Sequence, residues 1–307
     1  MIVTLFFVAI IIGVLFTDAY TDTIYSIGTI KNLIQPTGWN GVYAILCNML
    51  VIAITATQLT FLTSRYELVK EQTLLPALFF LLFQALNSSL INNFAGQNIA
   101  TMLVWIATFI LYACYQQDNT TEKGFLITLL LATASLFYGR ILYFLPIFFL
   151  GMLQMQAASP RTTAAMIIGL ITPYWITWGM GWIEGSQLDF TTLAMMWKLP
   201  PITPQFISVA FVMLLGLCVG GSNMLNALNE NIHTRAMNGF INIMSVYTAI
   251  LMIIDLAHYN EYLPLLNSCV ALQATYYFTT QNNRLNTIVF YGLIVLIIAF
   301  LAWSYWF

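Results

Sequence analysis

Apolar stretches long enough to cross a membrane recur along the whole chain, separated by polar segments. A bilayer core about 30 Å thick requires roughly 17–25 apolar residues in a helix. The clearest stretches are residues 43–62, 74–90, 99–115, 164–183, 206–221, 240–256, 263–278 and 288–307. Residues 1–16 add a short first span, because they lack the positive charges and the cleavage site of a signal peptide. The pattern predicts an all-α transmembrane helix bundle.

Residues 125–155 form an apolar stretch that is too long for one upright helix and is interrupted at Gly139 and Arg140. Two thin spans or a re-entrant hairpin would both fit. Lys and Arg in short loops favour the cytoplasmic side, so the charges help to choose the span count. Counting the stretch as a pair places these basic residues inside: Arg65, Lys70, Lys123, Arg161, Arg235 and Arg284. We therefore predict about eleven spans, with the N-terminus inside and the C-terminus outside.

Short amphipathic segments predict helices on the membrane surface at residues 24–34, 189–197 and 223–234. Pro173 should kink the span that contains it, because proline removes a backbone donor. No repeat or linker interrupts the chain, so residues 1–307 are predicted to form a single integral membrane domain.

Composition supports this class and excludes others. Hydrophobic residues make up 60% of the chain and charged residues only 7%, whereas an ordinary soluble domain has about 25% charged residues. A net charge of −2 with nine Lys and Arg provides no basic surface for nucleic acid. The four cysteines form no C-x-x-C pair and are expected to be small core residues, so we expect no metal site and no cofactor.

Uncharged polar residues lie within several predicted spans, among them Asn87, Asn238 and Asn242. The favoured interpretation is hydrogen bonding between helices, which occurs in every membrane bundle. The alternative is a polar cavity between the second, third, ninth and tenth spans. There, Asn87, Asn238 and Asn242 would bind a sugar or another neutral polar solute.

Charged residues near the ends of the spans are the other candidates. Arg140 either binds an anion such as a lipid pyrophosphate or, as an interfacial residue, contacts the lipid headgroups or a carboxylate. Asp18 and Asp22 follow the first span and are candidate general bases, although helix capping explains them as well. Asp255 and His258, with Glu261 nearby, are interpreted as a solvated turn in preference to a metal or proton site.

The middle third of the chain resembles an uncharacterised family of bacterial multi-spanning inner-membrane proteins. The residues that resemble this family are 132–146, 160–165 and 169–175. The chain is also similar, more loosely, to membrane-embedded glycosyltransferases of the GT-C type. That similarity implies a lipid-linked sugar as partner, with Asp18 or Asp22 as the acidic residue on the outer face, although the first outer loop is much shorter here. Both resemblances imply the bacterial inner membrane and its lipids.

Three functions therefore remain open. The first is an enzyme of GT-C type that handles envelope glycan or lipid-linked sugar and uses Asp18 or Asp22 with Arg140. The second is a secondary transporter for a polar solute. The third is a non-catalytic scaffold subunit with a small-residue interface such as Gly216, Gly220 and Gly221. Motifs of metalloproteases, serine hydrolases and P-loop ATPases are absent from the sequence. The enzyme ranks marginally first, because its charged residues share one membrane face.

The predicted topology can be tested by labelling single cysteines placed at Asn119 and Ser186 in a cysteine-free chain. A membrane-impermeant maleimide applied to intact cells should label position 186 and leave position 119 unlabelled until the membrane is opened. Labelling of both positions from the same side would contradict the topology.

Overall fold

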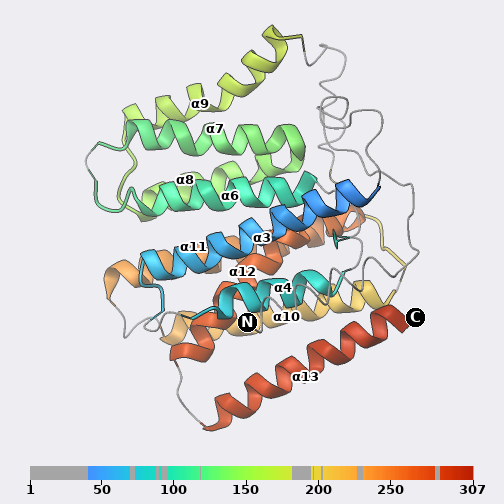
Figure 1. Ribbon diagram of the computed structural model, residues 1–307. Coiled ribbons are helices and arrows are strands. Elements are labelled where there is room, and N and C mark those ends of the chain that lie inside the picture. The colour runs from blue at the N-terminus through green and yellow to red at the C-terminus, as the bar shows by residue number, and fades with distance from the viewer. Residues whose placement is uncertain are drawn as a thin grey trace. The chain divides into compact units, whose positions relative to one another are not determined.

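The structure is a computed structural model in which every regular element of the described residues is helical (Figure 1). The predicted all-α class is therefore confirmed for this part of the chain. The predicted first span, the helix at 24–34 and nearly all of the helix at 189–197 lie outside the described residues. The structure describes residues 41–69, 73–87, 90–91, 96–117, 119–181, 195, 197–201, 203–226, 231–280 and 284–306.

The chain divides into two compact units, which are described separately. Unit 1 includes residues 45–94 and 196–307, and unit 2 includes residues 95–195. The prediction of a single integral membrane domain stays a prediction.

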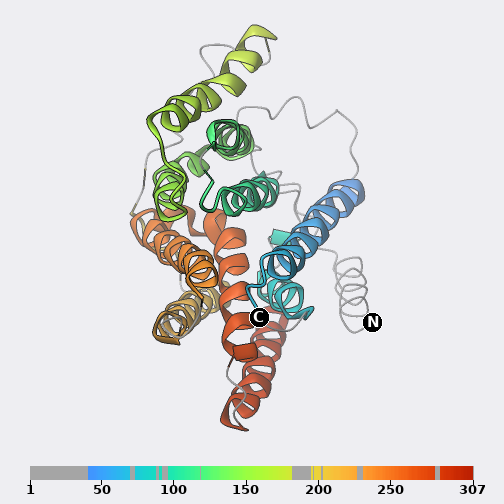
Figure 2. The same cartoon turned by 90° about the vertical axis from the view of Figure 1, so that its left-hand side faces the viewer.

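Unit 2 is built around α7 (Thr121–Phe137), which packs against α6 (Gly96–Tyr112) and α9 (Pro160–Gly179). Figure 1 shows these three helices side by side, and Figure 2 gives the same neighbours in a view turned by 90°. Ser159 caps α9 by accepting a hydrogen bond from the backbone N–H of Thr162 at 3.1 Å. Pro173 lies inside α9 as expected, and the kink there stays a prediction.

The predicted break after α7 is present. Tyr138 has an extended backbone with φ −147° and ψ 98°, which ends α7. The 3₁₀ helix η1 (Gly139–Phe144) follows, and α8 (Leu145–Gln154) begins with a proline in its first turn, where proline fits best. A single continuous helix through residues 125–155 is therefore excluded.

Unit 1 surrounds one central helix, α12 (Tyr259–Thr280), whose residues from Tyr262 to Tyr276 are all buried. Three helices pack closely against it: α4 (Leu75–Ala85), α10 (Pro204–Asn226) and α11 (Ile232–Ile254). The 3₁₀ helix η5 (Leu256–His258) joins α11 to α12. The remaining two helices of the unit are α3 (Gly41–Arg65) and α13 (Arg284–Trp306).

Two glycines allow α10 to approach α12. A Cβ atom built on Gly216 would lie 2.6 Å from Cγ2 of Val270, and one built on Gly220 would lie 2.9 Å from Nε2 of Gln273. Small residues spaced four apart are typical of closely packed membrane helices. Gly221 differs, because a Cβ atom there would meet no heavy atom within 4 Å.

Four helices of the described chain are long and apolar enough to cross a membrane: Ile45–Arg65, Pro204–Leu225, Ile232–Ile254 and Asn286–Trp303. In the last of these helices only 6% of the apolar stretch is buried, so almost all of its apolar surface is available to lipid. Surfaces of this kind are expected in a membrane protein.

The structure supports only part of the predicted span count. α4 has 11 residues, or about 16 Å of helix, which is half the thickness of the bilayer core. The span predicted at residues 74–90 was too long, because α4 ends at Ala85 and the polar residue Asn87 follows. The separate surface helix predicted at residues 223–234 is also wrong, since residues up to Asn226 continue α10 and α11 begins at Ile232.

The cysteines are core residues only in part. Cys114 and Cys269 are buried, whereas Cys218 is exposed on α10.

The glycine packing generates a matched pair of variants. Gly216→Ala should lower the thermal stability of the protein in detergent, because the new methyl group overlaps Val270, and overpacking of this kind costs about 1–3 kcal/mol. Gly221→Ala, five residues along the same helix, should leave stability unchanged or raise it slightly. Equal melting temperatures for the two variants would contradict the close packing of α10 on α12.

Candidate functional site

Buried polar side chains of unit 1 form what we call the amide layer: Asn223, Asn238, Asn242, Ser245 and Gln273. Gln273 of α12 lies at its centre. Its Nε2 donates to Oδ1 of Asn242 at 2.9 Å, and its Oε1 accepts from Oγ of Ser245 at 3.3 Å. Asn223 Nδ2 donates to the backbone oxygen of Gln273 at 2.9 Å. The layer therefore joins α10, α11 and α12.

Contacts of the α10 glycines show how α10 and α11 are aligned. The Cβ position of Gly216 is 3.5 Å from Ser245, and that of Gly220 is 3.6 Å from Asn242. The two helices are thus antiparallel. One turn further along α10 lies Asn223, and one turn back along α11 lies Asn238.

Two atoms of the layer have no hydrogen-bond partner among the described residues. They are the acceptor Oδ1 of Asn223 and the donor Nδ2 of Asn238. Both side chains are buried, with exposed fractions of 2% and 7%. Leaving a buried donor or acceptor unpaired costs about 1–3 kcal/mol, so these two atoms mark a place where a polar molecule would be stabilised.

Other amides of unit 1 bond to neighbouring segments, although Oδ1 of Asn267 and Oε1 of Gln58 also lack a hydrogen-bond partner among the described residues. Nδ2 of Asn267 on α12 donates to Oε1 of Gln84 on α4 at 3.1 Å. Nδ2 of Asn48 on α3 donates to the backbone oxygens of Leu90 and Ile91 at 2.7 and 2.9 Å. The hydrogen bonding between segments that the sequence predicts is therefore present.

Asn87 lies just beyond α4 and is 2% exposed, and its Oδ1 has no partner among the described residues. Among the described residues, no hydrogen bond joins its side chain to the amide layer. Of the three asparagines proposed as ligands, Asn242 bonds to Gln273, and Asn238 lies one turn away on the same helix without a hydrogen bond to the other described side chains of the layer. Asn223 was missed as a ligand, although it lies three residues beyond Gly220, where close helix packing could have been expected.

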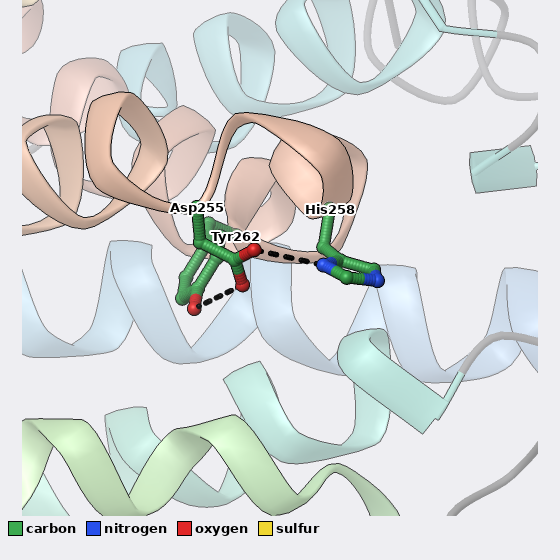
Figure 3. Close-up of polar contacts among 3 residues, drawn as sticks. All are labelled: Asp255, His258 and Tyr262. Carbon is green, nitrogen blue, oxygen red and sulfur yellow. Dashed lines mark hydrogen bonds and ion pairs between the residues drawn. The ribbon is translucent and has the colours of Figure 1, made fainter. Parts of the chain in front are cut away.

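A second polar site lies where α11 turns into α12 (Figure 3). Asp255 ends α11 and is completely buried. Its Oδ1 lies 2.8 Å from Nδ1 of His258, and its Oδ2 accepts a hydrogen bond from the Tyr262 hydroxyl at 3.2 Å. The His258 side chain is 29% exposed. The three residues therefore connect a fully buried carboxylate to the surface.

The prediction of a solvated turn is wrong for Asp255. The 3₁₀ turn of η5 folds the chain back, and the first turns of α12 then cover the carboxylate with Tyr262. The spacing of Asp255 and His258 was visible in the sequence, but the burial was not. Within the described residues no group of three His, Cys, Asp or Glu could hold a metal ion, so Glu261 does not complete a metal site here.

Arg140 lies in η1 of unit 2 and is only 7% exposed. This burial argues against the interpretation of Arg140 as an exposed residue among lipid headgroups. Asp18 and Asp22, the proposed catalytic residues, lie outside the described residues, so their positions relative to Arg140 are not described.

Comparisons of the chain with protein-family models, curated proteins and solved structures find no match. The class defined by the fold is that of an α-helical membrane protein, and its functional assignment rests on the chain's own residues.

The pairing of Gln84 with Asn267 can be tested by a double-mutant cycle. Gln84→Leu and Asn267→Leu should each lower stability, because each leaves a buried amide without its partner. The double variant should lose less than the sum, with a coupling energy of about 0.6–1.7 kcal/mol. Additive losses in thermal unfolding would contradict the bond.

Proposed function

We propose that the protein is a secondary transporter that binds a small, neutral polar solute at the amide layer of unit 1. The observation that supports this proposal is the pair of buried, unpaired amide atoms, Asn223 Oδ1 and Asn238 Nδ2. One is an acceptor and the other a donor, so a hydroxyl-bearing molecule such as a sugar could satisfy both. The layer contains no ionised group, which favours an uncharged solute.

The depth of the layer also fits transport. Asn242 is the eleventh residue of the 23-residue helix α11, which is long and apolar enough to span a membrane. Asn242 would therefore lie near the middle of the bilayer. Solute sites of secondary transporters are typically near the midplane, between helices that can move relative to one another.

The membrane setting is part of the proposal. We propose a multi-pass protein of the bacterial inner membrane, in contact with membrane lipids, in which the short loops that carry Lys and Arg face the cytoplasm. The four long apolar helices support the membrane location.

The second candidate is the enzyme of GT-C type that acts on envelope glycan or lipid-linked sugar. The burial of Arg140 favours it, because a buried guanidinium can bind pyrophosphate at two points. The scaffold hypothesis has less support, because Gly216 and Gly220 face Val270 and Gln273 inside unit 1 and are not available to a partner.

Solute uptake by proteoliposomes tests the transporter. A panel of radiolabelled sugars and polyols identifies the solute, and Asn238→Ala should then raise the half-saturating concentration about fivefold to tenfold, because one hydrogen bond to the solute is lost. Asn231→Ala is the matched control, since Asn231 begins the same helix, is exposed and makes no side-chain cap bond.

Equal uptake by the Asn238→Ala and Asn231→Ala proteins would contradict the proposed site. Absence of uptake for the whole panel, together with loss of surface glycan in cells with Arg140→Ala, Asp18→Asn or Asp22→Asn at unchanged protein level, would favour the enzyme instead.

A further inference from the structure

Asp255 is a fully buried acid at the opposite end of α11 from the unpaired amide of Asn238. A buried carboxylate in an apolar protein is costly to ionise unless it is paired, and such residues in membrane proteins commonly bind protons. We infer that Asp255 is a proton-binding site that exchanges protons with solvent through His258. We further infer that this exchange is coupled to solute binding at the amide layer, which rests on the proposed transport function.

The geometry provides a route for one proton. His258 Nδ1 lies 2.8 Å from Asp255 Oδ1, and the ring is partly exposed whereas the carboxylate is not. Figure 3 shows the second ring nitrogen of His258 pointing away from Asp255. The imidazole thus has one nitrogen on the buried acid and one available to take a proton from outside.

The transfer conserves the proton. A proton from solvent binds Nε2 of His258, and the proton on Nδ1 passes to Oδ1 of Asp255. His258 is left neutral with its proton on Nε2, and Asp255 becomes a carboxylic acid whose O–H donates to Nδ1. The reverse sequence releases one proton. Tyr262 donates to Oδ2 and holds the carboxylate in place.

The surroundings favour this assignment. The titratable groups nearest in the chain are His258 in η5 and Tyr259, Glu261 and Tyr262 in α12. Tyr259 packs edge-on against Phe206 of α10, with ring centroids 5.5 Å apart. Neither α10 nor α4 contains Asp, Glu, Lys, Arg or His, and α11 has only Tyr247 in its last two turns before Asp255. His258 is therefore a basic group placed to exchange a proton with this acid.

The same two helices connect the two sites. Asp255 and Asn242 are 13 residues apart, about 20 Å along α11, and Tyr262 and Gln273 are 11 residues apart, about 16 Å along α12. Protonation removes the negative charge that His258 and Tyr262 hold at the junction. A change in the contacts of this junction would move α11 against α12, which is where Asn242 bonds to Gln273.

Infrared difference spectroscopy of the purified full chain in lipid nanodiscs tests proton binding without any solute. Between about pH 4 and about pH 9, the wild type should show a carboxylic-acid carbonyl band that titrates. Asp255→Asn should abolish this band, and the matched control Glu261→Gln should retain it. His258→Gln should slow its appearance several-fold after a pH jump, and Tyr262→Phe should shift its frequency.

If the spectrum of Asp255→Asn matched that of the wild type, the inference would be wrong. Coupling is measured separately, as solute uptake driven by a pH gradient in proteoliposomes. If uptake is independent of the pH gradient in both the wild type and Asp255→Asn, the coupling is wrong and the transport function is retained. If the Asp255 band titrates but no solute is taken up, the proton site is retained and the transport function is wrong.

Discussion

The enclosure of α12 determines the organisation of unit 1. A helix that is buried on every side has no contact with lipid, so its side chains need not be apolar, but each polar group must find a partner inside the protein. Gln273 meets this requirement through Asn242 and Ser245 of α11, and Nδ2 of Asn267 donates to Gln84 of α4. The helices around α12 are therefore held by specific hydrogen bonds as well as by apolar packing. Lipid chains can replace the apolar packing contacts but not the hydrogen bonds.

Close approach of the backbones makes these bonds possible. Gly216 and Gly220 bring α10 near enough for Asn223 to reach the backbone of Gln273, and side chains at either glycine would occupy the space of Val270 or Gln273. The small residues and the amides thus act together to hold α10 close to α12. This explains why Gly216 and Gly220, two of the three glycines predicted as a surface for another subunit, face inward.

The sequence predicted the helices well, because each depends on a local run of apolar residues, and it placed the break at Gly139 correctly. It failed where the outcome depends on distant packing. Hydropathy alone could not distinguish α4, which is too short to span, from a longer span interrupted by Asn87. Nor could it reveal that Asp255 is buried, because η5 and Tyr262 of the next helix cover it. Asn238 and Asn242 were identified as candidates and Asn223 was not, and which amides pair depends on a register that only the fold defines.

Pairing and function compete within the amide layer. If every amide were satisfied by another side chain, the layer would only hold α10, α11 and α12 together, and a solute could bind only by breaking those bonds. Asn242, Ser245 and Gln273 bond to one another, whereas Asn223 and Asn238 each keep one atom unpaired. A solute bonded to those two atoms would gain hydrogen bonds without breaking the ones that connect the helices. Movement of α11 against α12 would change both sets at once, because Asn238 and Asn242 are one turn apart on a single helix.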